Sequence, residues 1–137
     1  MKNLYLIVFI CLTSNFSFAK DDYFSLRQEL NQMMELDQST LHGKTDRDFE
    51  KLRIEQANRI EEIVTEFGWP TIDMVGKDAS QAAWIIVQHA DYNKEYQDKM
   101  LKIMRPLALE GKINPANYAY LYDRTNRPQL YGTQGKC

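Results

Sequence analysis

Apolar residues recur at three- and four-residue steps along most of the chain, a pattern that predicts helices packed through one face. The first predicted helix covers residues 23–41. Gly43 follows it and suits a left-handed cap. The second covers residues 46–67, with its N-cap at Thr45-Asp46. It ends before Gly68-Trp69-Pro70-Thr71, where glycine and proline break the pattern.

A third predicted helix, residues 78–104, is the most apolar, and we expect it to be central. Residues 72–76 form a short connector without a clear preference. Asn114-Pro115 predicts the start of a fourth helix, and the residues from Thr125 onward favour turns and extended chain. The pattern therefore predicts an all-α fold: a single small domain of about four helices with an irregular C-terminal segment.

The first 19 residues resemble a cleaved secretory signal peptide. Lys2 precedes an apolar run over residues 4–12, and Ser17-Phe18-Ala19 ends in the small-x-small pattern that signal peptidase accepts. The run is too short to cross a bilayer. We therefore expect an exported protein, periplasmic or secreted, whose domain covers residues 20–137 and has no membrane span after cleavage.

Charge and cysteine content exclude several classes of protein. The chain has 17 basic and 19 acidic residues, a formal net charge of −2, and removal of Lys2 with the signal makes it more negative. This balance argues against a nucleic-acid partner, because such proteins normally carry a basic stripe. Only Cys137 remains outside the signal, so no internal disulfide and no cysteine metal cluster is expected. No metal-ligand or phosphate-loop motif is present, so we expect neither a metal nor another cofactor.

The densest polar cluster within an apolar segment is Gln88-His89-Ala90-Asp91. Histidine is the usual acid or base near neutral pH, and a carboxylate can orient it. His89 and Asp91 are two residues apart, about 200° around a helix, so the partner of His89 must come from elsewhere. A hydrogen-bonded histidine at the edge of the core explains the same residues equally well.

A second polar cluster lies near the C-terminus. Arginine binds carboxylates, and tyrosine and glutamine side chains bind hydroxyls and amides, so the cluster suits a polar substrate. A local Asp–Arg pair that holds an irregular segment in place is the competing explanation. The residues concerned are Tyr120, Asp123, Arg124, Arg127, Gln129, Tyr131, Thr133 and Gln134.

Four sequence patches, taken together, resemble an uncharacterised bacterial family known only as a domain of unknown function. The resemblance covers roughly residues 30–134 and implies a single helical domain, often exported or found in host-associated bacteria, without an established activity. The patches are Asp37-Gln38, Gly68-Trp69-Pro70-Thr71 with Gly76, residues 83–91 ending in Gln88-His89-Ala90-Asp91, and residues 118–124 followed by Gln129-Leu130-Tyr131-Gly132-Thr133-Gln134.

Two functional hypotheses follow, and the sequence leaves open whether the protein is an enzyme. The first is a small hydrolase or lyase in which His89 is the acid or base and Asp91 or Asp123 orients it. Its substrate contacts would be Gln88, Tyr120, Arg124, Gln129, Tyr131 and Gln134.

The second hypothesis is a protein-binding or inhibitory module without catalysis, anchored by Trp69, Tyr92, Tyr96 and Tyr131. The sequence therefore does not decide whether the partner is an envelope or extracellular protein or a polar small molecule. A purely structural envelope protein is a third reading of the same sequence.

Overall fold

The chain folds into helices, as the pattern predicted. The computed structural model describes residues 10–135, and this part contains five helices and no strand. The all-α prediction is confirmed, with five helices in place of about four. The helices are α1 (Ile10–Leu41), α2 (Phe49–Phe67), α3 (Ile72–Gln88), α4 (Lys94–Leu109) and α5 (Pro115–Thr125).

The first two helices end where predicted but begin elsewhere. Helix α1 begins at Ile10, so it includes residues 10–19 of the predicted signal, whereas residues 1–9 lie outside the described part. Helix α2 begins at Phe49 and not at residue 46. The reason is its cap: the Asp48 side chain accepts hydrogen bonds from the backbone N–H of Glu50 and Lys51, so Asp48 fills the position predicted for Thr45-Asp46.

The predicted helix over residues 78–104 is two helices, α3 and α4, separated at residues 89–93. Two side chains favour the break. Asn93 accepts a hydrogen bond from the backbone N–H of Tyr96 and so caps α4. Gln97 donates its Nε2 to the carbonyls of Val87 and Gln88, at 3.1 and 3.2 Å, and satisfies acceptors that a continuous helix would have used itself.

The unassigned connector over residues 72–76 is the first turn of α3. The turn is followed by a kink at Gly76, whose φ of 83° and ψ of 169° are non-helical. The guanidinium carbon of Arg27 lies 3.7 Å from where a Cβ would stand on Gly76. Glycine is therefore required here by its backbone conformation, and the open side of the kink is covered by α1.

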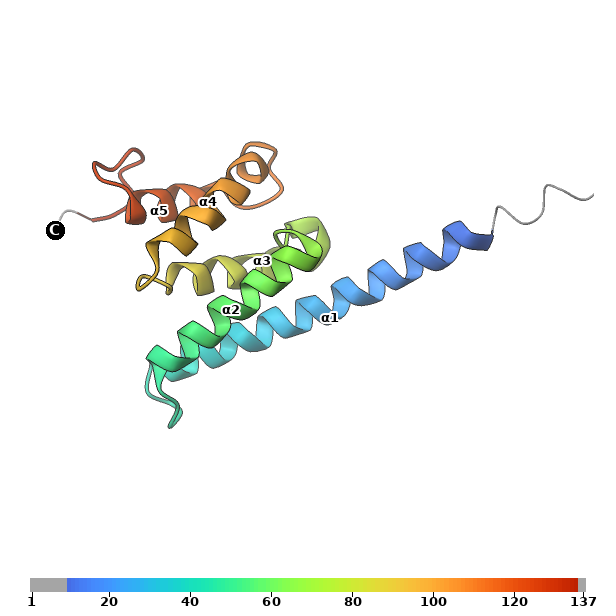
Figure 1. Cartoon of the computed structure of the whole chain (residues 1–137), viewed down its shortest axis with the longest axis horizontal. Coiled ribbons are helices and arrows are strands. Elements are labelled where there is room, and N and C mark those ends of the chain that lie inside the picture. Colours follow the sequence, from blue (N-terminus) through green and yellow to red (C-terminus); the bar gives the residue numbers. More distant parts are fainter. Residues whose placement is uncertain (1–9, 136–137) are drawn as a thin grey trace, which may run out of the picture.

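Helix α3 is central. It packs against each of the other four helices, and it lies between the α1–α2 pair and the α4–α5 pair (Figure 1). Ala79, Ala82 and Ala83 are completely buried, and their small side chains let neighbouring helices approach closely. The core around α3 includes Leu30, Ile60, Ile63, Ile86, Val87, Met100, Met104 and Leu121.

Helix α5 begins as the sequence predicted. The Asn114 side chain accepts from the backbone N–H of Ala116, and Pro115 occupies the first helical position. After Thr125 the chain is irregular up to the end of the described residues. None of the helices in the described part is long and apolar enough to cross a membrane.

Candidate functional site

The candidate site is built on a hydrogen bond between His89 and Asp37. His89 Nδ1 lies 2.9 Å from Oδ1 of Asp37, a residue of α1 that is completely buried. The second carboxylate oxygen accepts from Nε2 of Gln38 at 2.9 Å. The His89 side chain keeps 18% of its surface exposed. Because a carboxylate can only accept, Nδ1 carries the hydrogen and Nε2 of the neutral ring keeps a lone pair.

One face of α2 covers His89. Phe49 packs edge-on against the histidine ring, with the ring centroids 5.7 Å apart and an interplanar angle of 71°. One turn later, Arg53 Nη1 donates to the His89 carbonyl at 3.4 Å. The Arg53 guanidinium also pairs with Glu50 and lies 5.1 Å from the ring centroid of Tyr92. The His89–Asp37 pair therefore lies beside the Arg53 cation, whose buried Nε has no hydrogen-bond partner within the described residues.

The carboxylate beside His89 is that of Asp37, and not that of Asp91 or Asp123, which the sequence argument expected to orient it. A signal was present in the sequence. Asp37 lies seven residues after Leu30 and four after Met33, on the apolar stripe of the first helix. A carboxylate at a core position is more informative than an exposed one, because it requires a partner.

Asp91 forms an ion pair with Arg124 of α5. The Arg124 Nε lies 2.8 Å from Oδ1, and Nη2 contacts Oδ2, so the pairing is bidentate. The hydrogen bond from Arg124 lowers the pKa of the Asp91 carboxyl, more than its partial burial raises it. The Arg124 side chain is 30% exposed and that of Asp91 is 43% exposed. The competing explanation for the second cluster, an Asp–Arg pair, thus applies to Arg124, but the aspartate comes from the loop between α3 and α4.

Asp123 holds the C-terminal loop. Its completely buried carboxylate accepts hydrogen bonds from the backbone N–H of Leu130, Tyr131 and Thr133 and from the Thr133 hydroxyl, at 2.8–3.0 Å. Burial alone would raise the pKa of the Asp123 carboxyl. The four hydrogen bonds outweigh burial and hold the pKa at about 2. An irregular segment without helical bonding is thereby folded onto α5.

The predicted substrate-binding residues do not converge on His89. Nε2 of Gln134 donates to the Tyr120 carbonyl, and Gln129 accepts from the backbone N–H of Gln134. The Tyr131 ring packs against the rings of Tyr118 and Tyr122. The Gln88 carbonyl accepts from Gln97. The structure thus divides the predicted residues among three groups, centred on His89, on the Asp91–Arg124 pair and on the Asp123 loop.

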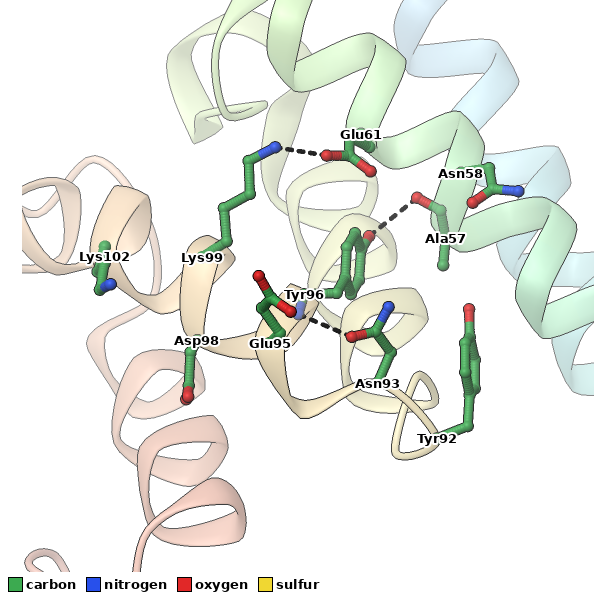
Figure 2. Close-up of a pocket in the computed structure, with 10 residues that line it drawn as sticks. All are labelled: Ala57, Asn58, Glu61, Tyr92, Asn93, Glu95, Tyr96, Asp98, Lys99 and Lys102. Carbon is green, nitrogen blue, oxygen red and sulfur yellow. Dashed lines mark hydrogen bonds and ion pairs between the residues drawn. The ribbon is translucent and has the colours of Figure 1, made fainter.

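A polar groove of about 670 Å³ lies between α2 and α4, with Tyr92 at one end and Lys102 near the other (Figure 2). Lys99 pairs with Glu61 across it, and the Tyr96 hydroxyl donates to the Ala57 carbonyl at 3.0 Å. His89 does not line this groove. Tyr92, at one end of the groove, is three residues from His89 in the sequence.

Two of the four aromatic anchors expected for a binding module are core residues. Trp69 is 3% exposed and Tyr96 is 7% exposed, and both belong to the apolar cluster around α3. They are therefore unavailable to a partner, because reaching them would require opening the core. Tyr92 and Tyr131, at 43% and 48%, are exposed.

Within residues 10–135, no group of three or more histidine, cysteine, aspartate or glutamate side chains is arranged to hold a metal ion. The His89–Asp37 pair presents an imidazole that is oriented by a carboxylate.

The comparison with known families assigns most of the chain to one family. A family model described as a family of unknown function (DUF6624) matches residues 24–137, most of the chain and all of the described domain after the first part of α1. The chain belongs to the DUF6624 family. No curated protein and no solved structure matches it significantly. The His89–Asp37 pair and the Asp123 loop both lie within the DUF6624 domain.

Proposed function

We propose that this DUF6624 protein is a small hydrolase or lyase in which His89 is the general acid or base and Asp37 orients it. The observation that carries the proposal is the hydrogen bond between the partly exposed His89 and the fully buried Asp37. A buried carboxylate fixes the ring orientation and the tautomer, as it does in hydrolytic sites that use a histidine base. The carboxylate also stabilises the imidazolium that forms when the ring takes up a proton.

The proton transfers follow from this geometry. In hydrolysis, Nε2 takes a proton from water as the water oxygen forms a bond to the substrate. The imidazolium then returns the proton to the leaving group as the bond to that group breaks. In an elimination, Nε2 takes the proton from carbon and the leaving group departs with the electron pair. Asp37 keeps the ring oriented and forms no covalent bond in either reaction.

Arg53 supports a substrate that is anionic or becomes so during the reaction. Its guanidinium binds the His89 carbonyl, is largely buried and lies against the Tyr92 ring. A cation in a partly desolvated position stabilises developing negative charge more than an exposed one does. Its ionic partner Glu50 is two-thirds exposed, so a substrate anion can replace it at little cost.

The test compares two histidines in the full chain. The purified protein is assayed against chromogenic esters, amides, glycosides, phosphoesters and uronate-containing polysaccharides. His89→Asn keeps a donor for Asp37 but removes Nε2, and His42→Asn makes the same change at an exposed loop position. We expect turnover to fall by at least about 100-fold in the first variant and to stay unchanged in the second. Turnover unaffected by His89→Asn, or none on any substrate class, would overturn the proposal.

A second candidate function, a binding module without catalysis, is favoured by one observation. Leu130 and Tyr131 are 66% and 48% exposed, yet the Asp123 carboxylate fixes their backbone. A fixed pair of exposed apolar residues loses little entropy when it docks. Retention of an envelope protein that is lost with Tyr131→Ala and kept with His89→Asn would favour this function over catalysis.

We also propose that the protein is exported and that the signal is removed after Ala19. The support is the sequence of residues 1–19, with its basic start, short apolar run and small residues before Lys20. The mass of the protein recovered from the cell envelope and the medium tests this. A mature chain that begins at Lys20 is expected, and Ala19→Phe should block its formation. Full-length protein confined to the cytoplasm would refute export.

A further inference from the structure

A second cavity, at the opposite end of α3 from His89, contains hydrogen-bonding groups that the fold leaves unused. The cavity has a volume of about 350 Å³ and lies between the first half of α3 and the start of α5. That volume is at the lower end of the range for small-molecule sites. Its walls contain Ser80, Gln81 and Asn117 on one side and Ile72, Ile113 and Pro115 on the other.

The polar side of the cavity is built from buried residues. Ser80 is 4% exposed and Asn117 is 6% exposed, although both line the open space. Ser80 lines the cavity with a short side chain whose hydroxyl can both donate and accept a hydrogen bond. Asn117 Nδ2 donates to Gln81 Oε1 at 2.8 Å. Whichever way the two carboxamides are assigned, this bond leaves one N–H₂ group and one carbonyl oxygen free.

From these groups we infer that the cavity binds a sugar-sized, hydroxyl-rich ligand, and that Lys77 favours one with a carboxylate. Two neighbouring hydroxyls complement the carboxamide pair, because one donates to the free carbonyl and the other accepts from the free N–H₂ group. The Ser80 hydroxyl can bind a third. The apolar wall matches the C–H face of a sugar ring. Lys77 is exposed at the cavity edge and has no ion-pair partner in the described part of the chain.

This site is independent of the proposed catalytic pair, since the two share no residue. Binding is followed by NMR in the full chain, through the side-chain amide signals of Gln81 and Asn117. The probes are D-glucuronate, D-glucose as its neutral counterpart, and glycylglycine as a peptide of similar size. We expect saturable shifts at both amides with glucuronate, binding at least about threefold weaker with glucose, and no response to the peptide.

Variants make the test specific. Ser80→Ala removes one hydroxyl without adding volume and favours the helix, so the protein should fold while glucuronate binds about tenfold more weakly. Lys77→Gln should remove the preference for glucuronate over glucose. Lys102→Gln, at another exposed lysine, on α4, should change neither value. Absence of shifts with glucuronate, unchanged binding in Ser80→Ala, or tighter binding of glycylglycine would overturn the inference.

Discussion

The strongest quantitative expectation concerns the stability of the His89–Asp37 pair. His89→Ala removes the partner of a carboxylate oxygen that has no access to water, and it also removes the ring on which Phe49 packs. Loss of one partner from a fully buried ion pair typically costs about 3–5 kcal/mol, and an unsatisfied neutral group costs about 1–3 kcal/mol. Since His89 keeps 18% of its surface exposed, water can reach part of the gap. We expect a loss near 3 kcal/mol, at the overlap of the two ranges.

His89→Asn separates the hydrogen bond from the rest of the side chain. The asparagine amide can donate to the same Asp37 oxygen, so most of the loss should be recovered and about 1 kcal/mol should remain for the missing ring contacts. Asp37→Ala should cost at least as much as His89→Ala, because it leaves the Gln38 amide as well as the histidine without an acceptor. In the double variant the two losses should not add, and a coupling of about 1–3 kcal/mol is expected.

The assay is urea unfolding of the full chain, followed by tryptophan fluorescence from the buried Trp69 and the half-buried Trp84. His42→Ala is the matched control, since this histidine is exposed and its removal should change the free energy of unfolding by less than about 0.5 kcal/mol. A loss in His89→Ala no larger than that of the control would refute this expectation. Equal losses for Ala and Asn at position 89 would also refute it, because packing alone would then account for the loss.

Three further outcomes follow from the same structure. Gly76→Ala forces a side chain onto a φ of 83° and should lower the free energy of unfolding by about 1–3 kcal/mol. Gly135→Ala, at a position with open space and no positive φ, should leave this free energy unchanged. An equal effect of the two variants on Tm would contradict the expectation. Asp123 has a pKa of about 2 in the fold, below its value of about 3.9 in an unfolded chain, so its stabilisation is present above pH 4 and is lost as the pH falls toward 2. Hydrogen exchange of the C-terminal loop amides should accelerate over that interval. Asp123→Asn should remove this pH dependence. Arg124→Ala breaks an ion pair with Asp91 that is partly exposed on both sides, so unfolding in urea should show a loss below about 1 kcal/mol that shrinks in high salt, and a loss as large as that of His89→Ala would be inconsistent with the exposure.

Much of the fold is legible in the sequence because local interactions determine it. The apolar stripes specify helices, and short polar side chains next to them mark several ends, as Asn114 does for α5. The break between α3 and α4 was harder to predict from the sequence. Apolar periodicity resumes after Asn93. The break is favoured by the Asn93 cap on α4 and by Gln97, which reaches back to the carbonyls of Val87 and Gln88.

For the candidate site, the sequence indicated individual residues but not how they pair. His89 stood out in the sequence as a titratable residue in an apolar segment, whereas Asp37 was noted only as part of the Asp37-Gln38 patch. Their pairing joins residues 52 positions apart, and it depends on how α1 packs against α3. In the same way, the role of Asp123 as the acceptor for a whole loop depends on where residues 130–133 return.

The sequence by itself thus determined the helical class, the ends of α1 and α2, the start of α5 and the identity of the residues able to carry a proton, because these follow from local spacing and side-chain chemistry. Tertiary structure alone decided which carboxylate meets His89, which aromatic residues are buried in the core and which polar groups line the cavity between α3 and α5. Those outcomes depend on contacts between helices distant in the chain, and the side-chain pattern of each helix is compatible with more than one such arrangement.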